Sequence, residues 1–186
     1  MDDNPHVIVD FVLGYTSVDM VRDQIDVALR IDVGSAGLKD SSLIARRLTR
    51  MKLGLFASPS YLAHKGKIES TEQLKNKDLI EFSRGKSFEF IRELLEDPTE
   101  QAQLQSRIKI NDIYCVKEAA ISGLGIAILP LLTAKYEVSA GALIPVLPEI
   151  TLPTIDLYVV YPNKRWMPAK LKIFLEHLSE LDIDSQ

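Results

Sequence analysis

The chain has 186 residues, of which 46% are hydrophobic and 26% are charged, a composition typical of a folded globular protein and not of a disordered or fibrous one. Its 22 Lys and Arg residues against 26 Asp and Glu residues give a net charge of −4, which argues against nucleic-acid binding through its own surface. The length predicts one compact body or two small lobes.

The first third of the chain predicts four strands and two helices. Apolar runs rich in β-branched residues predict the strands at 7–13, 27–31, 43–48 and 52–57. The first of these strands should be buried. Ser17, with Asp19 behind it, predicts the start of a helix that extends to about Gln24. Ser58-Pro59 predicts another helix, because the serine can cap it and the proline suits its first turn, and Gly66 predicts its end.

The rest of the chain alternates in the same way. Strands are predicted at 78–82, 107–110, 125–129, 143–147 and 155–161. Helices are predicted around Leu74, over 88–95, from Asn111-Asp112 through Ser122, and from Pro168 onward. The first of these helices follows Ser70-Thr71-Glu72-Gln73, which has the spacing of a capping box. Strands separated by helices indicate an α/β fold with mainly parallel sheets.

The sequence contains no recognisable metal, dinucleotide or hydrolase motif. The three histidines are isolated and offer no pair on one helix face: His6, His64 and His177. Gly123-Leu124-Gly125 follows a predicted helix and precedes a strand, the reverse of the order in a dinucleotide-binding loop. Gly34-Ser35-Ala36-Gly37 is not the nucleophile elbow of a hydrolase, and there is no P-loop. We therefore expect no metal, no cofactor and no covalent catalysis.

Several predicted helices begin with small polar residues: Thr16-Ser17, Ser58-Pro59 and Asn111-Asp112. Free backbone N–H groups at a helix start attract anions, and in open α/β sheets ligands bind at the carboxyl ends of strands, where such helices begin. A small carboxylate would fit there. The alternative is that these residues simply cap their helices.

Cys115 is the single cysteine, which excludes an internal disulfide and a multi-cysteine zinc site. We interpret it as a buried structural thiol in a reducing compartment. Residues Met1 to Pro5 contain two acids and lack the apolar stretch of a secretory signal, so a cytoplasmic location is expected. The longest uncharged stretch, 119–134, falls short of the roughly 20 apolar residues that span a bilayer.

An ordered set of segments resembles the effector-binding domain of LysR-type transcriptional regulators. The segments are NPHV (4–7), QIDVALR (24–30), DSSLIARRL (40–48), ASPSYL (57–62), ND (111–112), GLGIAILP (123–130) and GALIPVLP (141–148). Each segment alone is a weak signal. Their common order and spacing cover nearly the whole chain, which makes the set specific.

The resemblance implies an α/β fold of the type II periplasmic-binding-protein kind, in which two Rossmann-like subdomains are joined by crossover strands and a small effector binds in the cleft between them. One lobe would comprise residues 1–56 and 135–186, and the other residues 57–134. The crossings would fall near Ala57-Ser58 and Pro130. The family's first effector-domain strand and helix, and the winged helix-turn-helix and linker helix before them, would be missing from this chain.

The resemblance also implies which residues contact the effector: Thr16, Arg30, Ser58, Ser83, Asp112, Ile113 and Pro130. Arg30 could pair bidentately with an effector carboxylate, a geometry that lysine does not reproduce. The alternative for Arg30 is an ion pair with Asp26 or Asp32.

We therefore expect a non-enzymatic effector-sensing module of a transcription regulator that forms a homodimer or tetramer and reaches operator DNA through the absent N-terminal domain. Relatives pair through a helix and a strand of opposite lobes, which implies here the helix from Asp112 and the strand from Val7. Two alternatives are a free-standing solute-binding protein of the same fold, which needs a signal peptide, and an enzyme on this scaffold that uses Cys115.

Overall fold

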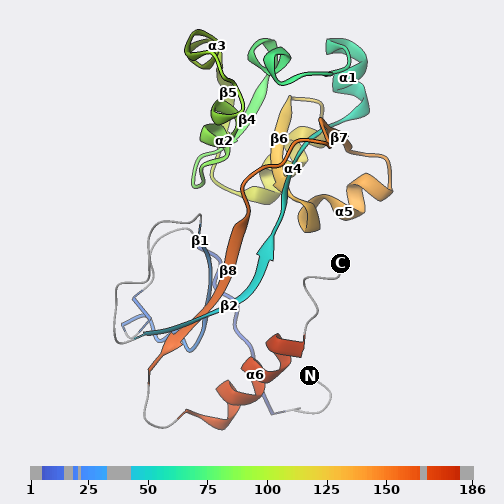
Figure 1. The fold of residues 1–186 in the computed structure, drawn as a ribbon. Coiled ribbons are helices and arrows are strands. Elements are labelled where there is room, and N and C mark those ends of the chain that lie inside the picture. The colour runs from blue at the N-terminus through green and yellow to red at the C-terminus, as the bar shows by residue number, and fades with distance from the viewer. Residues whose placement is uncertain (1–5, 15–18, 21, 33–42, 164–166, 181–186) are drawn as a thin grey trace. The chain divides into compact units, whose positions relative to one another are not determined.

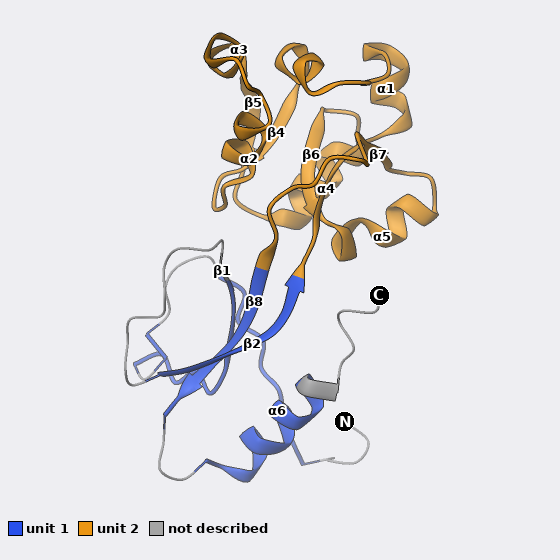
Figure 2. Cartoon of the chain, viewed as in Figure 1, with its two compact units in different colours: residues 1–50, 156–186 blue, residues 51–155 orange. Residues whose placement is uncertain are grey.

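The chain folds into two compact units that are described separately. The computed structural model describes residues 6–14, 19–20, 22–32, 43–163 and 167–180. Unit 1 contains residues 1–50 and 156–186, and unit 2 contains residues 51–155 (Figure 2). The units therefore change at Arg50/Met51 and Ile155/Asp156, whereas the expected lobes change at 56/57 and 134/135. The difference arises because the strand after Met51 and the segment after Pro130 both pack within unit 2.

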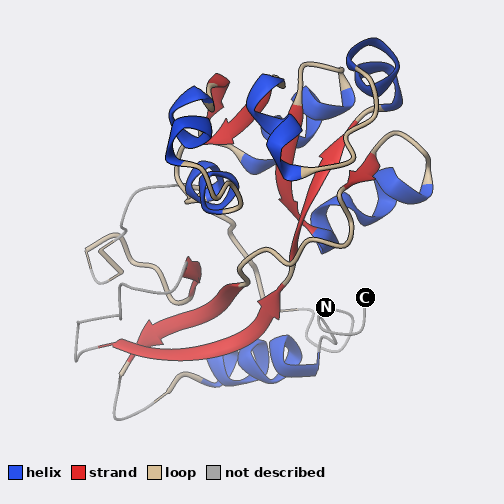
Figure 3. Cartoon of the chain, turned by 45° about the horizontal axis from the view of Figure 1, so that its top comes forward, coloured by secondary structure: helices blue, strands red, loops and turns tan. Residues whose placement is uncertain are grey.

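Unit 1 is built on a three-stranded sheet with the order β1-β8-β2. Its strands are β1 (Ala28–Asp32), β2 (Leu43–Met51) and β8 (Ile155–Pro162). β1 runs antiparallel to β8 and places Arg30 opposite Tyr158. The helix α6 (Ala169–Glu180) begins directly after Pro168, as predicted, and buries Leu171. Figure 3 shows this helix alongside the sheet.

The predicted buried strand at Val7–Leu13 is wrong. No strand is formed within residues 6–14, and Ile8 and Leu13 are each 94% exposed. A strand is held by hydrogen bonds to a neighbouring strand, and among the described residues none pairs with this segment. The same sheet leaves β1 at its edge with Leu29 and Ile31 more than half exposed.

Unit 2 is built on a five-stranded sheet with the order β5-β4-β6-β3-β7 (Figure 1). The strands are β3 (Leu53–Ala57), β4 (Leu79–Phe82), β5 (Ser106–Ile110), β6 (Ile126–Pro130) and β7 (Ile144–Val146). β4 is parallel to both β5 and β6, whereas β3 is antiparallel to β6 and β7. The sheet is therefore mixed, which corrects the expectation of mainly parallel sheets.

Helices flank this sheet and close its core. They are α1 (Pro59–Lys65), the 3₁₀ helix η1 (Thr71–Asn76), α2 (Ser87–Glu93), α3 (Pro98–Gln103), α4 (Ile113–Ile121) and α5 (Leu131–Ser139). Val116 and Ala120 of α4 pack with Phe56, Ile80 and Leu129 of the sheet in one buried cluster. Because β6 is buried along its whole length, its apolar run is continuous and does not alternate.

Local signals located most of the helix starts in unit 2. Ser58 caps α1 and Asp112 caps α4, as predicted. The capping box predicted at Ser70 is not formed. The Ser70 side chain makes no cap hydrogen bond, and the Gln73 side chain instead accepts from the backbone N–H of Glu69. α3 and α5 were not predicted. Across the described residues, every helix is too short or too polar to cross a membrane.

Candidate functional site

Three parallel strands of unit 2 end at the same edge of the sheet, and residues predicted to bind a ligand follow each of them. Ser83 comes after β4, Asp112 and Ile113 come after β5, and Pro130 ends β6. The backbone N–H of Ser83 donates to the carbonyl of Ile110 at 2.8 Å, which ties the ends of β4 and β5 together. We call this the carboxyl edge. Ligands of open α/β sheets bind at such an edge.

Lys52 completes the carboxyl edge from the neighbouring strand. β3 is antiparallel to β6, so it begins where β6 ends, with Leu53 opposite Pro130. The carbonyl of Lys52 accepts from the backbone N–H of Leu131 at 3.0 Å. The exposed Lys52 therefore lies beside Pro130.

The turn between β4 and α2 is held by its own hydrogen bonds. The Ser87 hydroxyl, which is buried, accepts from the backbone N–H of Phe82 at 3.2 Å, and the N–H of Gly85 donates to the Phe82 carbonyl at 3.2 Å. The two residues on either side of Gly85 are Arg84 and Lys86, and both side chains are exposed. Sequence reasoning missed them, although they directly follow Ser83.

Asp112 already occupies the N-terminus of α4. Its carboxylate accepts from the backbone N–H of Cys115 at 2.8 Å, so this helix end is less open to a bound anion than the sequence suggested. The hydrogen bond from the thiol to Asp112 raises the pKa of Cys115, which leaves it a poor nucleophile at neutral pH. Cys115 is also exposed, which corrects the buried assignment. Ile113 is partly buried against the core cluster.

Ser58 lies at the opposite edge of the sheet. It follows β3, and a Cβ built on Gly123, just before β6, would lie 3.5 Å from its hydroxyl. β6 spans five residues, so its two ends lie about 13 Å apart at roughly 3.3 Å per residue. The buried Ser58 hydroxyl accepts from the N–H of Tyr61 at 3.2 Å and contacts the Ser60 hydroxyl at 3.0 Å. Its observed role is therefore to cap α1.

The edge that carries Ser58 also holds a compact set of ion pairs. Asp78 lies 2.8 Å from the Arg107 guanidinium and 3.2 Å from the Lys65 ammonium. The hydrogen bond from Arg107 lowers the pKa of Asp78 most, with Lys65 adding to the effect. Both of these cations are thus already paired with an acid.

The two remaining predicted contacts belong to unit 1. Thr16 lies outside the described residues. Arg30 is half-buried in β1. Asp26, one of the acids considered as its partner, forms an ion pair with Lys170 at 2.7 Å.

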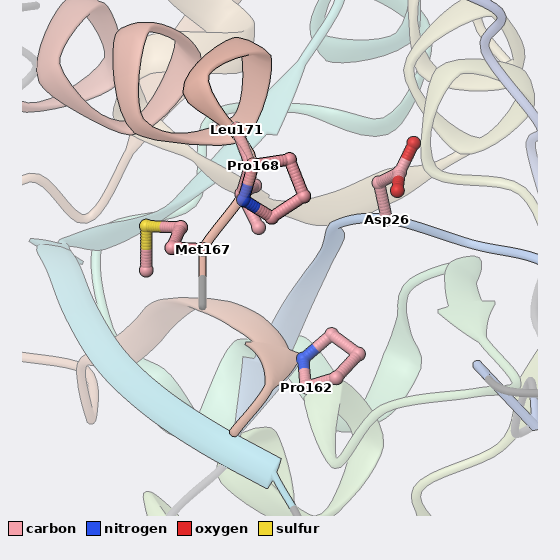
Figure 4. Close-up of a pocket in the computed structure, with 5 residues that line it drawn as sticks. All are labelled: Asp26, Pro162, Met167, Pro168 and Leu171. Carbon is pink, nitrogen blue, oxygen red and sulfur yellow. The ribbon is translucent and has the colours of Figure 1, made fainter. Parts of the chain in front are cut away.

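Unit 1 also contains a small hollow lined by Asp26, Pro162, Met167, Pro168 and Leu171 (Figure 4). Its volume of about 10 Å³ admits roughly one water molecule, which is far too little for a metabolite. Among the described residues, no three acidic, histidine or cysteine side chains are grouped so as to hold a metal ion.

Comparison with known proteins gives one consistent family. Residues 1–182 match the family model of the LysR substrate binding domain. The transcriptional activator AaeR of Escherichia coli is 28% identical over 180 residues, a match that covers 97% of this chain and 57% of that protein. The transcriptional regulator PtxR of Pseudomonas aeruginosa is 29% identical over 181 residues and is covered to 55%.

The solved structures agree with the sequence matches. The regulatory domain of CrgA, a LysR-type transcriptional regulator from Neisseria meningitidis, superposes with a TM-score of 0.72 at 27% identity. The match covers 91% of this chain and 80% of that domain. The chain spans little more than half the length of the curated relatives it matches.

Proposed function

Because the chain belongs to the LysR substrate binding domain family, we propose that it is the effector-sensing regulatory domain of a LysR-type DNA-binding transcriptional regulator that responds to a small anionic metabolite. The relatives named above are transcription regulators and not enzymes, which favours this function over the enzyme and over a free-standing solute-binding protein. DNA binding is assigned to a separate winged helix-turn-helix domain of the whole protein, and the site of action to the cytoplasm.

One observation supports the effector site. Ser83, Asp112, Ile113 and Pro130 are far apart in sequence, yet they meet at the carboxyl edge of one sheet. We assign the effector contact in unit 2 to this edge. Arg30 and Thr16 stay as proposed contacts from unit 1, and Ser58 is not retained because it caps α1 at the other edge.

The proposed response couples effector binding to packing between copies of the protein. An effector shifts a conformational equilibrium only by as much as it binds one state better than the other. The proposed lobes, residues 1–56 with 135–186 and residues 57–134, are the parts whose arrangement the effector would bias. The same change would then be passed to DNA-binding domains through the oligomer.

A thermal-shift screen tests effector binding. Small carboxylates are tested against the chain beside their neutral amides, and at least one carboxylate is expected to raise the melting temperature where its amide does not. Ser83→Ala should reduce that ligand-induced rise. Ser58→Ala is the matched control: losing the cap of α1 should lower stability by about 1 kcal/mol while the ligand-induced rise persists. No rise with any carboxylate, or equal loss in both variants, contradicts the assignment.

We propose a homodimer, or a tetramer built from it, in which α4 of one copy faces the 7–13 segment of another. Tyr114 of α4 is 65% exposed, and the 7–13 segment exposes Ile8 and Phe11. Tyrosine is enriched among the residues that contribute most of the binding energy at protein interfaces.

Tyr114→Glu is therefore expected to convert a dimer into a monomer in light scattering, because it places a charge in the interface. Tyr136→Glu changes an even more exposed tyrosine on α5 and should leave the dimer intact. A monomeric parent chain, or dissociation by both substitutions alike, would argue against this interface.

A further inference from the structure

We propose that Arg84 and Lys86, on the turn between β4 and α2, are the residues by which unit 2 selects an anionic effector, with Lys52 adding charge from the start of β3. This inference rests on the proposed function and extends it, because it names the side chains that read the charge of the ligand. The turn is the short connection between the ends labelled β4 and α2 in Figure 1.

The cations at the two edges of the sheet differ in whether they form ion pairs. At the edge of Ser58, Lys65 and Arg107 both pair with Asp78. At the carboxyl edge, none of the cations Arg84, Lys86 and Lys52 forms an ion pair with another described residue. Their positive charge is thus left for a ligand, whereas each cation of the other pair already contacts an acid.

The backbone of the turn is fixed before any ligand arrives. Three hydrogen bonds hold it: Ser83 N–H to Ile110 at 2.8 Å, Gly85 N–H to Phe82 at 3.2 Å, and Phe82 N–H to the Ser87 hydroxyl at 3.2 Å. The Ser87 side chain is buried and accepts the last of these hydrogen bonds, which fixes the turn to the protein interior. A ligand that binds here orders two side chains but no backbone, which lowers the entropic cost of binding.

Two acids at the carboxyl edge oppose this charge: Asp112 at the start of α4 and the exposed Glu89 in the first turn of α2. Asp112 carries a carboxylate, but that group accepts from Cys115 N–H at the start of α4. The positive end of a helix dipole offsets part of a charge placed there. Two cations on the turn and Lys52 beside Pro130 therefore exceed these two acids, one of which is already engaged in a hydrogen bond. An arginine also offers the two parallel donors that a carboxylate accepts.

Paramagnetic cosolutes measure the local potential directly and need no known effector. The ¹⁵N-labelled chain is exposed in turn to an anionic carboxylate nitroxide and a cationic amino nitroxide of the same ring, and amide proton relaxation is compared. At the Ser83, Gly85 and Ser87 amides the anionic nitroxide should enhance relaxation at least twice as much as the cationic one. In Arg84→Gln/Lys86→Gln that ratio should fall to about one or below.

Lys67→Gln is the matched control, since Lys67 is an exposed lysine in the loop after α1, and it should leave the ratio at Ser83 unchanged. Stronger relaxation by the cationic nitroxide in the parent chain would overturn the proposal, because Asp112 and Glu89 would then dominate the potential at the edge. An unchanged ratio in the double variant would overturn it too. Either result can occur while a carboxylate still raises the melting temperature, so failure here is distinguishable from failure of the proposed function.

Discussion

Gly125→Ala is expected to destabilise the chain by about 3 kcal/mol, a large effect for a single methyl group. A Cβ at this position would lie 2.3 Å from the carbonyl oxygen of Asp78 and 3.2 Å from the Ile80 side chain. That carbonyl accepts from the N–H of Ile126 at 2.8 Å, at the point where β4 and β6 begin to pair. Backbone must move to relieve the contact, so the pairing that aligns the carboxyl edge is disturbed.

Urea unfolding followed by far-ultraviolet circular dichroism measures this loss. Gly141→Ala is the control, because Gly141 has a φ of 73° and open space around it. It should lose about 1 kcal/mol from backbone conformation alone. Equal losses in the two variants would mean that the contact with Asp78 contributes nothing.

Lys117→Met is expected to cost about 2 kcal/mol, because it leaves a buried carboxylate without its partner. Lys117 of α4 pairs with Glu137 of α5, and their side chains are only 12% and 13% exposed. The second carboxylate oxygen of Glu137 is buried and accepts no hydrogen bond. The double variant Lys117→Met/Glu137→Leu should recover much of the loss, since it removes the unpaired charge as well.

The pH dependence of the Lys117→Met effect has a defined sign. The hydrogen bond from Lys117 lowers the pKa of Glu137 below its unfolded value. Such a group stabilises the fold above the unfolded pKa, and that contribution disappears as the pH falls through the folded pKa. The stability gap between the parent chain and Lys117→Met should therefore narrow on acidification below about pH 4. A gap that stays constant or widens would contradict the ion-pair explanation.

Most structural features that depend on residues close together in the chain were predicted correctly, whereas some features that depend on distant residues were not. Ser58-Pro59 and Asp112 specify helix starts through bonds that span three residues, and both predictions are confirmed. The strand at Val7–Leu13 depends on a neighbour far away in the chain, so its apolar pattern could not establish it. α5 was missed because Pro130, which has no capping side chain, stands at its start.

At the candidate site, too, features implied by the local pattern were predicted and a feature set by distant strands was not. Parallel strands bring Ser83 and Asp112 to one edge, as the alternating pattern implied. Ser58 ends at the other edge because β3 is antiparallel, a direction that no local signal specifies. Arg84 and Lys86 were overlooked because exposed cations are common. Only the comparison with Lys65 and Arg107, which both pair with Asp78, makes it informative that neither forms an ion pair among the described residues.

A ¹H–¹⁵N correlation titration of the chain, with the carboxylate that raises its melting temperature most, tests whether the effector binds at the carboxyl edge. The largest unit 2 amide shifts are expected at Ser83, Gly85, Asp112 and Ile113, with little change at Ser58 and Asp78. Largest shifts at Ser58 and Asp78, or shifts confined to the hollow between Asp26 and Pro168, would contradict an effector site at the carboxyl edge.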